Sequence, residues 1–142
     1  MDYAKLSGEF LQTVHRFQRI RAQQQISESM HGEAFALFYV AQHDGTTIPS
    51  DICNVMGVSS ARIATVLNGL ENKGFITRQI DPRDRRRTIL KLTPAGEEQA
   101  AQNTQQLQDS VTQMLEYLGE HDAKEYVRII GRLADKHIKG MD

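Results

Sequence analysis

The sequence predicts a mostly α fold with one small β-hairpin, an α+β arrangement with long helices at both ends of the chain. Apolar residues recur at steps of three and four near both ends, which is the spacing of one helix face. Two short runs, 76–80 and 88–92, alternate apolar and polar residues around turn-forming residues, as a hairpin does. A chain of 142 residues most often forms one domain, so we expect a single domain over 1–142.

The first part of the chain predicts one long helix that breaks near residues 30–32. Its apolar face is formed by Leu6, Phe10, Val14, Phe17 and Ile20. Three shorter helices are expected next. The first covers 33–43, and the second begins at Pro49, because proline suits a first helical turn, and stops at Gly57.

The third short helix has the clearest ends. Ser59 is a favourable N-cap, and helix over 62–73 would bury Ile63, Val66, Leu67 and Leu70. Gly74 suits the left-handed position after the helix, where Phe75 can fold back on Leu70. Gly69 lowers helix propensity inside this helix, which suggests a close backbone approach there.

The C-terminal part predicts two more helices. Thr93 is expected to cap a helix that starts at Pro94 and runs to about Leu118. Gly119 interrupts the pattern, and Asp122 or a neighbour would cap the last helix. One side of that last helix would carry Tyr126, Ile130, Leu133 and His137, with Val127, Ala134 and Ile138 beside them.

Positive charge is concentrated in residues 78–93, RQIDPRDRRRTILKLT. This segment has six basic residues against two acidic ones, an excess of +4 on a chain whose net charge is -1, so the rest of the chain carries -5. A basic hairpin on an otherwise acidic protein indicates a polyanionic partner. The basic residues are Arg78, Arg83, Arg85, Arg86, Arg87 and Lys91.

Composition excludes several other classes. No apolar run approaches the roughly 20 residues that span a bilayer, so no membrane contact is expected. The first residues lack the apolar core of a signal peptide, and the single cysteine cannot form an internal disulfide, which favours the cytoplasm. Phosphate-binding glycine loops, a His-Glu-x-x-His motif and a nucleophile elbow are missing from the sequence, so no enzyme and no cofactor are expected.

The segment 49–73 has the plan of a helix-turn-helix, with Val58 plugging the angle between its two helices. Hydroxyls and backbone N–H groups at the start of the second helix suit phosphate oxygens, and arginine can pair with guanine. The candidate DNA contacts there are Ser59, Ser60, Ala61, Arg62 and Thr65. A basic hairpin directly after such a helix makes a winged helix, whose wing can place an arginine in the minor groove.

These residues resemble the winged-helix core of the MarR family of bacterial transcriptional regulators. The family pattern has Val-Ser opening the recognition helix, Leu-Glu-x-x-Gly closing it, and Asp-x-Arg in the wing before Leu-Thr. The matching residues are Val58-Ser59, Leu70-Glu71 with Gly74, Asp84-Arg85-Arg86, and Leu92-Thr93. The resemblance covers nearly the whole chain and is most specific between residues 59 and 93.

The resemblance implies a division of labour along the chain. Residues 33–93 would form the winged helix-turn-helix, and the helices in 1–30 and 94–142 would interlock into an obligate homodimer. Asp84 would brace Arg86 in the minor groove, while Arg85 and Arg87 face phosphates; Arg78 is a further expected DNA contact. A dimer predicts a pseudo-palindromic operator with half-sites roughly 34 Å apart, and we expect a repressor released by a small ligand.

The family resemblance also implies an effector site, because MarR-type regulators bind small phenolic or lipophilic anions between the dimer helices and the winged helix. An aromatic wall with an arginine would suit a small aromatic or lipophilic effector. The candidate residues are His15, Arg16, Phe35, Phe38 and Tyr39. The alternative is that these aromatic residues belong only to the core.

Other functions compete with this one. Cys53 is either a small core residue or a redox-sensing thiol in a thiol-responsive regulator. The five histidines have no recognised zinc spacing, so no metal site is expected. A winged helix used only as a protein–protein adapter is the other alternative, and lack of sequence preference in DNA binding would distinguish it.

Overall fold

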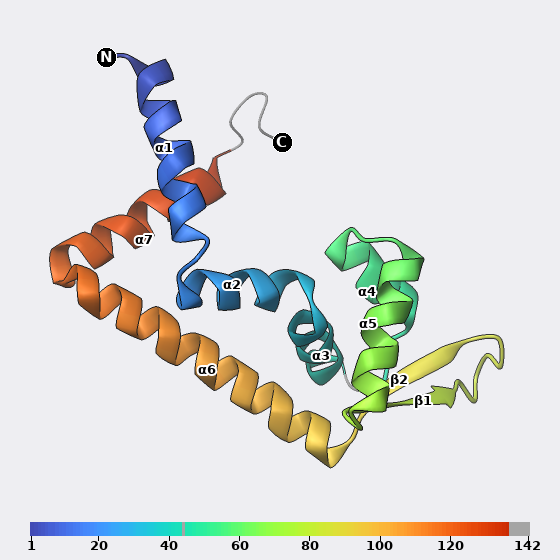
Figure 1. Cartoon of the computed structure of the whole chain (residues 1–142). Helices are drawn as coiled ribbons and strands as arrows, with labels where there is room; N and C mark the ends of the chain where they lie inside the picture. Colours follow the sequence, from blue (N-terminus) through green and yellow to red (C-terminus); the bar gives the residue numbers. More distant parts are fainter. Residues whose placement is uncertain (44, 137–142) are drawn as a thin grey trace. The chain divides into compact units, whose positions relative to one another are not determined.

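The computed structural model describes residues 1–43 and 45–136 (Figure 1). Within them the predicted fold class is confirmed, since helices accompany a single two-stranded antiparallel hairpin. The chain forms two compact units, Met1–Leu107 and Gln108–Asp142. The elements are α1 (Tyr3–Phe17), α2 (Arg21–His31), α3 (Glu33–Gln42), α4 (Pro49–Met56), α5 (Ser60–Asn72), β1 (Ile76–Ile80), β2 (Thr88–Leu92), α6 (Pro94–Leu118) and α7 (Glu120–Asp135).

The core of the first unit lies where α3, α4, α5 and the hairpin meet. All four apolar positions predicted to be buried on α5 are buried, and Val58 packs against this core from the turn between α4 and α5. Side chains removed from water in this way supply most of the stability of a small domain. The buried core residues are Ala36, Leu37, Val40, Ile52, Ile63, Val66, Leu67, Leu70, Ile76 and Leu90.

The hairpin is anchored at one end only. β1 pairs with β2 so that Ile76 lies opposite Leu92 and Ile80 opposite Thr88. At the inner end Leu90 also donates a backbone hydrogen bond of 2.9 Å to Thr47, which forms an isolated bridge. Ile80, at the outer end, is 69% exposed. The outer half of the hairpin therefore projects beyond the core and forms a wing (Figure 1).

The predicted ends of the recognition helix α5 are confirmed. Ser59 caps it by accepting a hydrogen bond of 3.1 Å from the backbone N–H of Arg62. At the other end Gly74 has a φ of +78°, its N–H donates to Glu71, and the N–H of Phe75 donates to Leu70. These two bonds form a Schellman motif, which satisfies the last carbonyls and turns the chain into β1.

Thr93 joins the wing to α6. As predicted, its hydroxyl oxygen caps α6, accepting a hydrogen bond of 3.0 Å from the N–H of Gly96, and Pro94 is the first helical residue. The same hydroxyl donates to the carbonyl oxygen of Gly74 at 2.6 Å, and the N–H of Thr93 donates to Phe75. One residue thus fixes the start of α6 against the end of α5.

Two predicted boundaries were wrong. The expected first long helix is divided at residues 18–20, where Ile20 is extended and caps α2. That break has no Gly or Pro; it is made by two tight hydrogen bonds, Arg19 to Arg16 and Ile20 to Phe17. The last helix begins at Glu120 with Gly119 as its cap, rather than near Asp122. The expected His137 and Ile138 positions lie outside the described residues.

The terminal helices expose apolar side chains. In α1 these include Tyr3, Leu6, Phe10 and Leu11, and in α7 they include Val127, Ile129, Ile130 and Leu133. Apolar surface of this extent is typical of a site that another protein surface covers. Of the helices among the described residues, none combines the length and apolarity needed to cross a membrane.

Two helix glycines make a matched stability test. A Cβ on Gly96 would overlap the backbone of Phe75, lying 2.9 Å from its carbonyl carbon, whereas a Cβ on Gly69 would meet only the flexible end of the Glu33 side chain. We therefore expect Gly96→Ala to lower the free energy of unfolding by about 1–3 kcal/mol, because the α6–wing junction must move.

Gly69→Ala should leave the free energy of unfolding within about 1 kcal/mol of the wild type. The gain in helix propensity offsets the loss of the exposed Lys73–Glu33 ion pair, whose N–O distance is 2.6 Å. Urea denaturation monitored by circular dichroism measures both variants. Equal destabilisation by the two substitutions would contradict the difference that we assign to backbone contact.

Candidate nucleic-acid interface

The exposed side of α5 is the surface that a DNA groove can reach. Its buried positions face the core, and the opposite stripe, whose residues are three or four positions apart, is exposed. This groove stripe consists of Ala61, Thr65, Asn68 and Asn72. Ala61 and Thr65 were predicted as DNA contacts. Asn68 was missed, although its position seven residues after Ala61 places it on the same face.

The structure gives the other predicted residues of α5 different surroundings. The hydroxyl oxygen of Ser59 accepts the hydrogen bond that caps the helix, and the Thr65 hydroxyl donates to the carbonyl oxygen of Ala61 at 3.2 Å. Ser60 is exposed beside the groove stripe. Arg62 is exposed on its other flank, where it lines a shallow pocket with His31, Glu28 and Glu33. Base or phosphate contacts by these residues remain a prediction.

Arg78 lies at the inner part of the wing and reaches back to α5. Its Nη2 donates a hydrogen bond of 2.7 Å to Asn68 Oδ1, and its Nε lies 3.5 Å from Glu71 Oε2. The side chain is 33% exposed. Sequence reasoning grouped Arg78 with the free arginines of the wing, and it did not foresee that Arg78 is engaged within the protein.

The wing turn is built by two aspartates. Asp81 is buried, accepts from the backbone N–H of Arg83 at 2.9 Å, and donates its own N–H to the carbonyl oxygen of Arg87. Asp84 accepts from both the backbone N–H and the Nε of Arg86, at 3.1 and 3.2 Å. The pairing of Asp84 with Arg86 is the one that the family resemblance implies.

Arg86 is held in position while its charge stays accessible. Its side chain is 91% exposed, and Arg85 and Arg87 beside it are exposed as well. The pKa of Asp84 is held below its ordinary value. The largest cause is the side-chain hydrogen bond from Arg86, followed by the hydrogen bond from the backbone N–H of Arg86, and the charge of Arg87 adds to them. At neutral pH the turn therefore presents an oriented arginine, which suits phosphates or a narrow minor groove.

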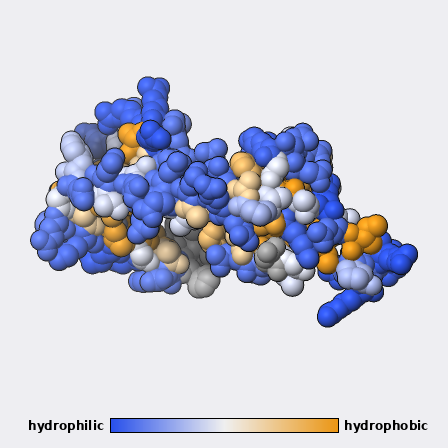
Figure 2. Space-filling model, turned by 90° about the horizontal axis from the view of Figure 1, so that it is seen from below, coloured by the Kyte–Doolittle hydropathy of each residue, from blue (hydrophilic) through white to orange (hydrophobic). Residues whose placement is uncertain are grey.

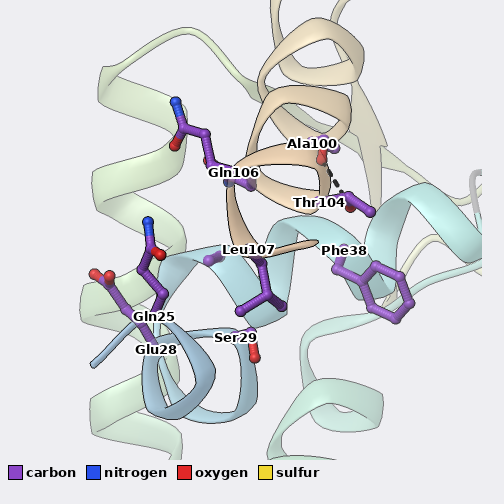
Figure 3. A pocket seen from close by; sticks show the side chains of 10 residues that line it. Gln25, Glu28, Ser29, Phe38, Ala100, Thr104, Gln106 and Leu107 are labelled. Atoms are coloured by element: carbon purple, nitrogen blue, oxygen red, sulfur yellow. Dashed lines mark hydrogen bonds between the residues drawn. The ribbon is translucent and has the colours of Figure 1, made fainter. Parts of the chain in front are cut away.

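A pocket of about 250 Å³ lies between α2, α3 and the first part of α6 (Figure 3). Phe38, Leu107, Ala34 and Ala100 give it an apolar wall. Gln25 also lines the pocket, and its buried Oε1 atom has no hydrogen-bond partner among the residues that the structure describes. The remaining lining residues are Glu28, Ser29, Asn103, Thr104 and Gln106, so among the residues that line it Glu28 alone is ionisable.

Of the predicted effector residues, Phe38 lines this pocket. Phe35 and Tyr39 pack partly buried against the core, with ring centroids 6.3 Å apart, and Tyr39 stacks on His43 at 4.3 Å. His15 and Arg16 are exposed on α1. These four residues are not brought together with Phe38 at the pocket, and a role for them in effector binding remains a prediction.

Cys53 is partly buried in α4 and packs against the core, with its Sγ 4.0 Å from the carbonyl oxygen of Ser59. This is the placement of a small core residue near the turn of the helix-turn-helix. Within residues 1–43 and 45–136, no three His, Cys, Asp or Glu residues cluster as metal ligands.

The surface seen in Figure 2 is mostly hydrophilic, with separate apolar clusters. On the wing, Ile80 is one of the exposed large apolar residues. The wing thus combines arginines with an exposed apolar residue, whereas the groove stripe of α5 carries small and amide side chains.

Comparisons with known proteins agree with this geometry. The MarR family model matches residues 29–87, the segment from the end of α2 to the wing turn. YwhA of Bacillus subtilis (strain 168), named as an HTH-type transcriptional regulator, is 31% identical over 144 residues, which cover 94% of this chain and 99% of the relative. The chain belongs to the MarR family and is a DNA-binding transcriptional regulator.

Solved structures share the fold across nearly the whole chain. YusO of Bacillus subtilis has a TM-score of 0.72 at 22% identity, covering 94% of this chain and 97% of YusO. A point mutant of MepR from S. aureus, solved bound to an oligodeoxyribonucleotide, has a TM-score of 0.60 at 20% identity, covering 94% of this chain and 96% of MepR. At these identities the likeness concerns the fold.

The pKa of Asp84 tests the brace in the wing. Because folding lowers this pKa, the contribution of the Asp84–Arg86 pair to wing order is present at neutral pH and is lost as the pH falls through the folded-state value. We expect carboxyl NMR titration to give a midpoint below that of an ordinary aspartate. Arg86→Met should raise this midpoint, and the control Arg85→Met should leave it nearly unchanged; identical midpoints in all three proteins would refute the brace.

Proposed function

We propose that this regulator is a repressor that binds a pseudo-palindromic operator as a homodimer and is released by a small ligand. The observation that carries operator binding is the oriented wing arginine, Arg86, held by Asp84 next to a helix-turn-helix with an exposed groove stripe. In this proposal α5 enters the major groove while each wing follows the backbone into the neighbouring minor groove.

The dimer is proposed from the exposed apolar faces of α1 and α7. Both helices carry several large apolar side chains more than a third exposed, a surface that is costly to leave in water. A second copy of the chain would bury these faces and place two recognition helices about one helical turn of DNA apart. In the domain division that we propose, residues 33–93 bind DNA, and residues 1–30 with 94–142 dimerise.

The remaining roles follow from position and charge. Arg85 and Arg87 are proposed to contact phosphates on either side of Arg86. The α5 residues proposed to approach the edge of the groove are Ser60, Ala61, Arg62 and Thr65.

We propose that the protein acts in the cytoplasm, where its one cysteine stays reduced. Transcription regulators of this family are not enzymes, and we propose no catalytic reaction.

Replacing Arg86 with Ala tests the role of the wing. We expect operator affinity to fall by about 1–3 kcal/mol per subunit, with a smaller dependence of affinity on salt, because a groove-bound cation is lost. Fluorescence anisotropy with a duplex selected from a random-sequence pool by the wild type measures both quantities.

Arg19→Ala is the matched control, since it removes an exposed arginine that is distant in sequence from the wing. Its operator affinity should stay close to that of the wild type. An Arg86→Ala protein with wild-type affinity would exclude the proposed minor-groove contact.

We propose the pocket behind Phe38 as the effector site. Apolar walls suit an aromatic or lipophilic body, and the unpaired oxygen of Gln25 suits a hydrogen-bond donor on the ligand. Glu28 and neutral amides line the remainder. This lining favours a neutral or cationic effector, whereas the sequence suggested an anion held by Arg16.

A matched ligand panel tests this choice. Small aromatic molecules with the same ring system and a carboxylate, an amide or an amine should differ in thermal shift, with the amide or amine raising the melting temperature more. At about 100 times Kd the stabilisation is about 2.7 kcal/mol.

Gln25→Ala should weaken the response to the amide or amine, and Phe38→Ala should weaken it for the whole panel. Ser7→Ala, on α1, is the control. A larger thermal shift with the carboxylate than with the amide or amine in the wild type, or an amide and amine response that Gln25→Ala leaves unchanged, would contradict the proposed site.

A further inference from the structure

Arg78 holds a special position between the two DNA-reading elements. It shares one face of β1 with Ile76, since alternate strand residues point the same way, and Ile76 is buried. The Arg78 side chain therefore returns toward α5, where it meets Asn68 and Glu71. The wing-tip arginine Arg86 differs, because its side chain is 91% exposed and is paired with Asp84 of its own turn.

Asn68 is the partner whose chemistry matters. It lies on the exposed groove stripe of α5 between Thr65 and Asn72, so its side chain faces the surface that DNA approaches. A terminal amide carries one oxygen that accepts and one nitrogen that donates, and it can turn over to exchange them. Which of the two meets a base decides the base that it reads.

The arginine removes this ambiguity. Guanidinium groups only donate hydrogen bonds, so the group of Asn68 that faces Arg78 at 2.7 Å is the oxygen Oδ1. The amide nitrogen, with its two N–H donors, is left for the groove. Glu71, whose Oε2 lies 3.5 Å from the Nε of Arg78, helps to keep Arg78 in place.

We propose that Arg78 is a positioning residue that sets base specificity by holding Asn68 with its N–H donors toward the major groove. Held in this way, Asn68 reads an acceptor edge, such as guanine O6 and N7 or thymine O4. It is less suited to the two-bond contact with adenine, which needs the amide oxygen as well as the nitrogen. This inference rests on the operator reading proposed above.

The alternative for Arg78 is direct phosphate contact, and the two roles differ in measurable ways. Loss of a phosphate contact lowers affinity for all sequences and reduces the salt slope of log Kd by about 0.9 per contact. Loss of a positioning residue changes which base is preferred at one position of each half-site and leaves the salt slope unchanged.

The experiment uses the full-length protein and a duplex selected from a random-sequence pool by the wild type. Asn68→Ala first identifies the operator position that Asn68 reads, because discrimination among the four bases is lost there. Affinities for the four duplexes that differ only at that position, and the salt slope, are then measured for Arg78→Met. We expect adenine to gain about fivefold or more relative to the preferred base, with the wild-type salt slope.

Three further variants make the result specific. Arg78→Lys keeps a donor for Asn68 Oδ1 and should keep the wild-type base preference. Asn68→Asp keeps an acceptor for Arg78 but has no N–H donors, so it should lose the preferred base without losing thermal stability. Arg83→Met removes an exposed wing charge and should leave base preference at this position unchanged.

An Arg78→Met protein with the wild-type base preference would overturn the proposal. If its salt slope is also lowered by about 0.9 per subunit, the result assigns Arg78 to phosphate. Failure of the operator reading itself is distinguishable, because the wild-type protein would then select no sequence from the pool.

Discussion

The junction of α5, the wing and α6 is the constraint on which the DNA-binding surface depends. The Thr93 hydroxyl donates to the carbonyl oxygen of Gly74 and caps α6 through Gly96, while Gly96 lies directly against the backbone of Phe75. These contacts fix where the recognition helix ends and where the wing begins. The proposed reading of two grooves needs this relation to be fixed, because a small change in angle would move the wing tip away from the DNA backbone.

A second layer of contacts turns this scaffold into a reader of DNA. Asp81 and Asp84 shape the wing turn through backbone N–H groups, so that the basic residues extend from a defined loop. Arg78 ties the same hairpin to the exposed face of α5 through Asn68. The arginines of this segment therefore differ in their surroundings. Arg78 joins the wing to α5, whereas Arg85, Arg86 and Arg87 are exposed at the turn.

The charge distribution follows the same division. The acidic remainder of the chain repels DNA, whereas the basic segment 78–93 attracts it. Electrostatic attraction therefore also orients the protein as it approaches DNA. The pocket beside Phe38 lies away from this basic segment in sequence, on α2, α3 and the start of α6. Ligand binding there would act on the helices that carry the DNA-binding core rather than on the arginines themselves.

Local sequence determined much of this protein. Capping residues and glycine predicted the ends of α5 and the start of α6, because Ser59, Gly74 and Thr93 form capping hydrogen bonds with backbone groups a few residues away in the chain. The charge run marked the wing for the same reason. The division of the first helix was not predictable, since no Gly or Pro stands at residues 18–20 and only hydrogen bonding and packing place the turn there.

Only the tertiary structure decided which residues distant in sequence come into contact. Periodicity could have placed Asn68 on the groove face, yet its meeting with Arg78 depends on the hairpin folding back onto α5. The pocket combines residues 25–38 with 100–107, so neither segment alone reveals it, and it left Arg16 outside. Secondary structure and charge are local properties of a chain, whereas a site is made by side chains that only folding brings together.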